Sequence, residues 1–194
     1  MYEIREMLPD DLPAVTALWR VRVRWAEYRG IGLIRYCPLT AAEEAAAQPF
    51  ALTCDGAVVA TATIVDQTPH VGWTAREAAQ RAVGLVRIVT DPALAADRLS
   101  WVITSWASDR AAHTGHAWVR MRVAPSQLAR HLSEHLAWEP VRTVRTADGG
   151  TAHLLQHEAR EIPGIRALVQ DAHAMSGTLP AQSAPDGSHP FTTA

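Results

Sequence analysis

The sequence predicts one mixed α/β domain in which helices cover the faces of a central β-sheet. Segments with strand-like alternation and segments with helical periodicity follow one another in the order β-α-α-β-β-β-α-β-α-β-β. Two glycine-containing turns, Asp55-Gly56 and Asp148-Gly149-Gly150, have the composition of hairpin turns within this order. The length of 194 residues is sufficient for one domain with a substantial core, and the sequence contains no internal repeat.

The N-terminal part is expected to form a strand and two helices. Residues 2–6 alternate between polar and apolar side chains and predict a short strand. A helix follows, for which Asp10 is the expected N-cap. Thr40 and Glu43 have the spacing of a capping box and predict the start of the second helix.

The middle of the chain is expected to form a hairpin, an insertion, a strand and a helix. Two β-prone runs flank Asp55-Gly56 and predict the hairpin. Residues 69–82 are an insertion, expected to be a loop with one helical turn. Residues 84–89 predict a strand, and the helix after it is expected to end near Gly115, because glycine is typical of helix C-termini.

The C-terminal part is expected to add a strand, a helix and a second hairpin. Residues 117–123 alternate cleanly, and Ser126 is the expected cap of the helix that follows them. Residues 139–158 predict the hairpin. Residues 165–175 are compatible with a short helix, and residues 176–194 have the composition of a disordered tail.

A change in composition divides the chain near residue 158. Pro, Gly, Ser and Ala dominate the sequence from Ile162 onward. We therefore expect a folded domain at residues 1–158 and a C-terminal extension at residues 159–194.

The composition excludes several classes of protein. The formal net charge of -2 argues against non-specific nucleic-acid binding, which requires a basic surface. All 18 basic residues are arginine, which is typical of a bacterium with a GC-rich genome. Cys37 and Cys54 are too few for a disulfide framework. Because the sequence has no signal-peptide pattern and no long apolar run, we expect a cytoplasmic protein without a membrane partner.

Four segments resemble those of a known superfamily. They are "YEIREMLPDDLPAVTALW", "DGAVVATATI", "VRIVTDPALAADRLSWVI" and "LARHLSEHLAWEPVRTV". In this order they resemble the opening strand and helix, the central hairpin, the pyrophosphate loop and the closing segment of the GNAT acyl-CoA N-acyltransferases, over residues 2–157. The resemblance implies the GNAT fold, which is a mixed and mostly antiparallel central sheet with helices on both faces.

The resemblance also implies acetyl-CoA or another acyl-CoA as co-substrate. In this superfamily the strand before the loop splays from its neighbour, and its backbone pairs with the pantetheine arm and polarises the thioester. That role falls here to Arg87, Ile88 and Val89. The loop after the strand directs backbone N–H groups at a helix N-terminus toward the pyrophosphate.

The cofactor loop departs from the superfamily pattern, [Q/R]-x-x-G-x-[G/A]. The matching residues are Ala95, Ala96, Asp97, Arg98, Leu99 and Ser100. Arg98 replaces the middle glycine, so its side chain could fill the phosphate site or bind the phosphate directly. Arg98 and Leu99 can still present their N–H groups if the loop is αR-like, and the Asp97 carboxylate would repel a pyrophosphate.

The proton-transfer residue departs as well. Ser133 occupies the position where the superfamily commonly has a tyrosine that protonates the leaving thiolate. A thiolate needs little help from an acid, so this loss need not abolish transfer. His131 and its neighbours Glu134 and His135 could substitute, and Glu27 is a candidate general base for the amine.

The acceptor site is expected near the end of the first helix. The resemblance implies an aromatic and partly cationic pocket there, built from Trp25, Tyr28, Arg29, Arg35 and Tyr36. The same residues could serve only to pack and anchor that segment. Trp73, in the insertion, could cover the cleft.

Metal binding is the weaker interpretation of the nine histidines. His113 and His116, and likewise His131 and His135, have spacings that can bind zinc. The sequence lacks the Glu directly after His131 that a zinc protease motif would require. We therefore expect no metal and interpret these histidines as solvent-facing or hydrogen-bonded helix residues.

The function that these observations favour is transfer of an acetyl or other acyl group from acyl-CoA to the amine of a small molecule. The two altered sites keep an alternative open, in which the GNAT fold binds a small metabolite without CoA. Transfer from an aminoacyl-tRNA is disfavoured because no basic stripe is present. The resemblance is compatible with a homodimer formed through sheet edges.

Overall fold

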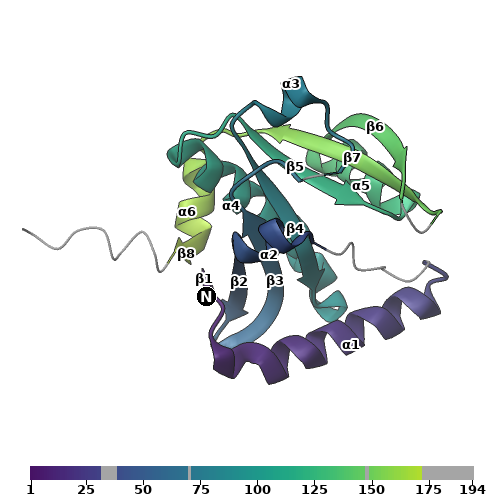
Figure 1. The fold of residues 1–194 in the computed structure, drawn as a ribbon. Coiled ribbons are helices and arrows are strands. Elements are labelled where there is room, and N and C mark those ends of the chain that lie inside the picture. Colours follow the sequence, from purple (N-terminus) through teal and green to yellow (C-terminus); the bar gives the residue numbers. More distant parts are fainter. Residues whose placement is uncertain (32–38, 70, 147–148, 172–194) are drawn as a thin grey trace, which may run out of the picture.

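An eight-stranded sheet forms the centre of the structure, a computed structural model that describes residues 1–31, 39–69, 71–146 and 149–171. The strand order is β6-β7-β5-β4-β3-β2-β1-β8 (Figure 1). The pairs β4–β5 and β1–β8 are parallel, and all other neighbours are antiparallel. The strands are β1 Tyr2–Glu6, β2 Ala47–Cys54, β3 Ala57–Val65, β4 Ala82–Thr90, β5 Trp118–Val123, β6 Glu139–Arg145, β7 Thr151–Glu158 and β8 Val169–Asp171. The prediction of a mixed, mostly antiparallel sheet is confirmed.

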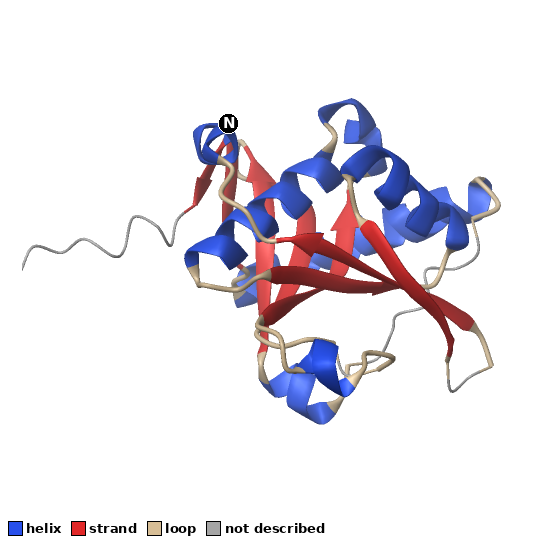
Figure 2. Ribbon diagram, turned by 90° about the horizontal axis from the view of Figure 1, so that it is seen from above, coloured by secondary structure: helices blue, strands red, loops and turns tan. Residues whose placement is uncertain are grey.

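Helices cover both faces of this sheet, as predicted (Figure 2). They are the α-helices α1 Leu12–Tyr28, α2 Ala41–Ala45, α3 Ala75–Ala78, α4 Leu99–His113, α5 Ser126–Leu136 and α6 Pro163–Leu168, and the 3-10 helices η1 Pro9–Asp11 and η2 Pro92–Asp97. α1 packs against β3 and β4, and α4 packs against β3, β4 and β5. Within the described ranges, no helix has both the length and the apolar composition that crossing a bilayer requires.

The main core lies between the sheet and the helices α4 and α5. Val83 and Leu85 of β4 and Val119 and Met121 of β5 face into it. Each of these side chains is less than 4% exposed. Strand residues alternate between faces, so Arg120 of β5 points to the opposite face, where it is also fully buried. The insertion that carries α3 covers it there.

Three local sequence signals are confirmed. Thr40 and Glu43 form a capping box: the Glu43 N–H donates to Thr40 Oγ1 at 3.2 Å, and the Thr40 N–H donates to Glu43 Oε2 at 2.7 Å. Asp55 and Gly56 turn the β2–β3 hairpin with φ of 49° and 82°. Gly115, with φ of 74°, follows α4 in the left-handed conformation that glycine favours.

Two predicted helix caps are wrong. Asp10 does not cap α1, because the 3-10 turn η1 comes first and Asp11 takes the N-cap position. The Asp11 carboxylate binds Arg5 at 2.7 and 2.9 Å, and this ion pair holds the pKa of Asp11 below its ordinary value. Ser126 is not the cap of α5, because it is the first helical residue after Pro125 and no side chain caps this helix.

The C-terminal segment differs from the predicted helix at residues 165–175. The helix α6 ends at Leu168, and residues 169–171 form β8, which pairs with β1. α6 packs on α4, where Asp109 Oδ1 accepts the N–H of Ile162 at 2.7 Å. Ile165 is 1% exposed, so the described part of the extension shares the core of the domain. Residues 172–194, including the predicted tail, lie outside the described residues, as does Asp148 of the second predicted turn.

Candidate active site

A cleft opens where β4 and β5 separate. The two strands pair over Ala82–Gly84 and Trp118–Arg120 and then run apart (Figure 1). The resulting cavity has a volume of about 160 Å³. β4 contributes Leu85, Val86, Arg87, Ile88 and Thr90 to its wall, and β5 contributes Met121, Arg122 and Val123. The opening of a parallel pair therefore places strand backbone at the cleft.

A β-bulge shapes the β4 wall of the cleft. The register of β3 against β4 shifts between Thr61 and Thr63, which leaves Arg87 and Ile88 opposite the single residue Ala62. Arg87 has a φ of 53°, which is unusual for a residue other than glycine. A bulge takes backbone groups out of the strand ladder and bends the strand, so β4 can direct N–H or C=O groups elsewhere.

The side chain of Arg87 is held by α2. Its guanidinium forms a two-pronged ion pair with Glu44, with N–O distances of 3.0 and 2.7 Å. Ile88 lines the cleft beside it, whereas Val89 is 6% exposed and belongs to the buried residues. The predicted strand residues thus divide into two that face the cleft and one that does not.

The N-terminus of α4 provides the second set of backbone groups. Arg98, at the N-cap, is left-handed with φ 53° and ψ 42°, which differs from the αR-like conformation considered as one condition for presenting these N–H groups. The position keeps the backbone conformation that glycine favours. Among the described residues, no acceptor binds the N–H groups of Leu99 and Ser100. Two unpaired donors and the helix dipole make this end of α4 suited to an anion.

The loop side chains before α4 are occupied elsewhere or exposed. The Tyr2 hydroxyl donates to Asp97 Oδ2, and this bond raises the pKa of Tyr2 to about 12. Asp97, Ala95 and Ala96 are exposed and do not line the cleft. Of the predicted loop residues, only Ser100 is part of the cleft wall.

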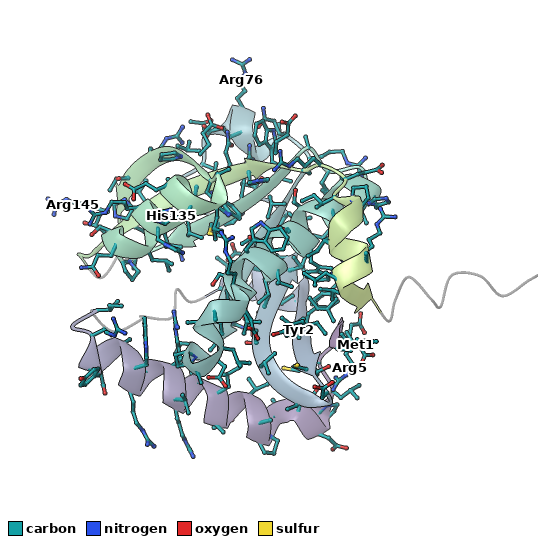
Figure 3. All side chains as sticks on the ribbon, turned by 180° about the vertical axis from the view of Figure 1, so that it is seen from behind. Met1, Tyr2, Arg5, Arg76, His135 and Arg145 are labelled. Carbon is teal, nitrogen blue, oxygen red and sulfur yellow. The ribbon has the colours of Figure 1, made fainter. Side chains whose placement is uncertain are left out.

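The predicted acid residues on α5 do not line the cleft. The Ser133 hydroxyl donates to the Ala129 carbonyl on its own helix at 3.0 Å, whereas Leu128 and Leu132 form the α5 wall. His131 is exposed and its ring contacts that of His135 edge-on, with 4.9 Å between centroids. Burial, then His135 and Arg98, lower the pKa of His131. Figure 3 shows His135 well away from Tyr2 and β1.

The predicted acceptor residues on α1 lie near the cleft without lining it. Glu27 and Tyr28 are exposed, and Tyr28 has 89% of its surface free. Trp25 is half-buried, and the guanidinium carbon of Arg22 lies 4.3 Å from its ring centroid. Arg35 and Tyr36 lie outside the described residues.

Trp73 does not line the cleft either. The guanidinium carbon of Arg120 lies 4.5 Å from its ring centroid. Trp73 therefore packs within the insertion that covers Arg120, and nothing places it over the cleft as the sequence suggested.

Four charged or aromatic residues of the cleft wall were not among the predicted site residues. They are Trp19 and Arg22 of α1, Glu43 of α2 and Arg122 of β5. The capping box accounts for Glu43 without any role in a cleft. The alternation of β5 predicts which face of the strand Arg122 lies on, but not which residues lie beside it. For Trp19 and Arg22, the helical spacing of three residues was the only available signal.

The described residues contain no group of three or more His, Cys, Asp or Glu side chains that could hold a metal ion. His113 instead lies beside Asp109, and His116 Nε2 lies 2.8 Å from Asp66.

Solved structures that are similar to this chain include several acetyltransferases. The aminoglycoside acetyltransferase AAC(6')-Ib, solved with coenzyme A, aligns with a TM-score of 0.58 at 18% identity, over 87% of this chain and 98% of that one. A GNAT-family acetyltransferase from Listeria monocytogenes aligns with a TM-score of 0.56 at 16% identity, over 81% and 94% of the two chains. This chain has the GNAT fold.

A third structure of this fold is the ribosomal-protein-S18-alanine N-acetyltransferase from Escherichia coli. It aligns with a TM-score of 0.53 at 20% identity, over 84% of this chain and 96% of that one. No family model matches the sequence, and no curated protein matches it. The GNAT similarity is therefore one of structure, and it covers nearly the whole length of the enzymes compared.

Proposed function

We propose that this protein is an N-acyltransferase that transfers an acyl group from acyl-CoA to the amine of a small molecule. The observation that carries the proposal is the joining, in one cleft, of a bulged β4, a separated β5 and the N-terminus of α4. Proteins of the same fold include an acetyltransferase solved with coenzyme A, which supports this choice of co-substrate.

The residues present fit acyl-CoA. The N–H groups of Leu99 and Ser100 would hold the pyrophosphate, because they lie at a helix N-terminus and no described residue accepts a hydrogen bond from them. Leu128 and Leu132 of α5 offer an apolar wall for the pantetheine arm. Arg98 has a left-handed backbone, a conformation that glycine favours.

Bound acyl-CoA would supply an activated acyl group: the amine nitrogen bonds to the acyl carbon, the carbon–sulfur bond breaks, and the sulfur leaves as a thiolate. Backbone N–H groups of the β4 bulge at Arg87 and Ile88 would donate to the acyl oxygen as its negative charge grows, a role that the register shift in this strand supports. The amine must lose one proton during the transfer, and the released thiolate can take up a proton from solvent.

Glu43 is the carboxylate best placed to receive the amine proton. It lines the cleft and is 5% exposed, whereas Glu27 is exposed and outside the cleft wall. We therefore propose Glu43 in place of Glu27 as the general base. His131 and Ser133 remain candidates for assisting the thiolate, with Ser133 already bonded within its helix.

Calorimetric titration with coenzyme A tests the proposal directly. We expect one binding site with a dissociation constant in the range of about 1–100 μM, and release of free thiol when acetyl-CoA and an acceptor amine are both present. If the folded protein gives no heat with coenzyme A, the alternative holds, in which the cleft binds a metabolite without CoA.

Glu43→Gln tests the assignment of the base. Gln retains the capping box with Thr40, so the fold should be preserved while the base is removed. We expect kcat to fall about 100-fold, with little change in coenzyme A affinity. Glu27→Gln is the matched control and should keep normal kcat. The reverse result would restore Glu27 as the base.

A further inference from the structure

The charged side chains of the cleft are unevenly paired. Arg22, Arg87, Arg122 and Glu43 line it. Arg87 is neutralised by Glu44, with which it forms two contacts of 3.0 and 2.7 Å. No carboxylate among the described residues pairs with Arg22 or Arg122. Among the described residues that line the cleft, two guanidinium groups without a carboxylate partner thus accompany the Glu43 carboxylate, which gives this set a positive balance.

Arg122 lies on the face of β5 opposite the α5 wall, Leu128 and Leu132, that we propose for the pantetheine arm. Val119 and Met121 face the core beneath α4 and α5, and Arg120 faces the opposite side. Alternation along the strand places Arg122 on the same side as Arg120. Arg122 thus belongs to the wall opposite Leu128 and Leu132, where an acceptor can approach.

Arg22 comes from α1, which forms another wall of the cleft. It is half-buried beside Trp25, and burial lowers the pKa of its guanidinium. Holding a partly desolvated cation without a carboxylate partner has an energetic cost, which a bound anion would offset. Trp19, one helical turn earlier, adds an apolar surface next to it.

We infer that the acceptor is a small amine that also carries an anionic group on an apolar body, of which an apolar amino acid is the simplest example. Arg22 and Arg122 bind the carboxylate, and Glu43 attracts the ammonium end before accepting its proton. Leu39, Pro69 and Trp19 contact the apolar side chain. This inference rests on the proposed function, because it names the acceptor class for the same cleft.

Matched acceptors with and without the negative charge test the inferred acceptor class. L-leucine and L-phenylalanine are compared with their carboxamides, which keep the amine and lose the negative charge, at saturating acetyl-CoA with thiol release as the readout. We expect kcat/KM to be about tenfold or more higher for the amino acids. Arg122→Gln and Arg22→Gln should each reduce that preference toward one by raising KM for the amino acid.

The control is Arg24→Gln, because Arg24 is an exposed residue of α1 outside the cleft wall. It should keep the preference, and all three variants should bind coenzyme A within about twofold of wild type. Equal or better use of the carboxamides by wild type overturns the inference. So does a result in which Arg22→Gln and Arg122→Gln weaken coenzyme A binding and leave the acceptor preference unchanged.

A binding readout separates this inference from the proposed function. If coenzyme A does not bind, the proposed function fails, but the thermal midpoint can still be measured with L-leucine and with leucinamide. A rise with L-leucine alone that Arg122→Gln abolishes supports the anion site. No rise with either compound overturns it.

Discussion

Arg120 and Arg122 lie two residues apart on the same face of β5, yet their surroundings differ completely. Arg120 is 0% exposed, and its Nη atoms donate to Thr68, to the Glu77 carbonyl and to Gln80. Trp73 covers its guanidinium. Arg122 is half-buried in the cleft, and none of the described residues binds its guanidinium.

The difference separates an arginine bonded within the fold from one that we propose binds a ligand. At Arg120 the chain supplies the acceptors, because the insertion between β3 and β4 folds over β5 and brings them there. At Arg122 the strands have separated, and no described residue supplies an acceptor. The Nη atoms of the buried Arg120 are hydrogen-bonded within the fold, whereas the half-buried Arg122 is the arginine that we propose binds a ligand.

Removing the two arginines in turn should give the largest contrast. Arg120→Met is expected to lower the free energy of unfolding by about 3 kcal/mol, since Thr68, Gln80 and the Glu77 carbonyl lose a buried donor. Arg122→Met should change it by less than about 0.5 kcal/mol. Urea denaturation measures both. Similar effects for the two variants would break the distinction.

A substitution at Gly72 tests how tightly the insertion packs against β6 and β7. A Cβ there would lie 2.9 Å from Leu154 Cδ1 and 3.0 Å from Val144 Cγ1, at a φ of +92°. Gly72→Ala is therefore expected to cost about 2 kcal/mol of stability, combining backbone strain with overpacking. Gly56→Ala is the control: its φ is +82°, but nothing lies within 4 Å, so it should cost only about 1 kcal/mol. Equal costs would show that the insertion can yield at this contact.

The Glu77–Arg142 ion pair predicts how the insertion responds to acid. Hydrogen bonds from Arg142 and from the Thr74 backbone N–H lower the pKa of Glu77 to about 2. The ion pair therefore stabilises the fold at pH values above the pKa that Glu77 has in the unfolded chain. The stability advantage of wild type over Glu77→Gln should be complete above about pH 5 and disappear as the pH falls toward 2. Urea denaturation at several pH values tests this. A constant advantage down to pH 2 would contradict it.

The smallest effect is expected at the C-terminal end of α5. Ala137 has a φ of 56°, where glycine is favoured. Ala137→Gly should raise the free energy of unfolding by about 1 kcal/mol. Ala129→Gly, in the interior of the same helix, is the opposite control and should lower it. Destabilisation by Ala137→Gly would mean that the alanine methyl group packs usefully there.

The fold could be predicted from the sequence because its signals are local. The capping box at Thr40, the turn at Asp55-Gly56 and the glycine at 115 each specify a conformation through nearby residues. β8 could not be predicted, because three residues become a strand only when β1 offers an edge to pair with. The predicted capping by Asp10 was wrong for a related reason. The ion pair between Asp11 and Arg5 of β1 depends on how the strand and the helix meet.

The site was predicted less well, because it is assembled from distant segments. The resemblance to the GNAT superfamily implied a role for Arg87, Ile88 and Ser100, and the structure brings all three to the cleft. The side chains that face them come from α1, α2 and β5, and no sequence spacing connects these. Arg98 shows a further limit: the sequence could not reveal that a non-glycine residue adopts a left-handed backbone there.

The central claim is that main-chain donors at the start of α4 hold the pyrophosphate of a CoA ester. Ser100→Pro tests it most directly, because proline is tolerated in the first turn of a helix and removes one N–H that no described residue uses. Ser100→Ala keeps that N–H and removes only the hydroxyl. With both variants shown to be folded by circular dichroism, we predict that coenzyme A binding in calorimetry weakens about tenfold or more for Ser100→Pro and stays within about twofold for Ser100→Ala. Wild-type affinity in the proline variant would contradict the account.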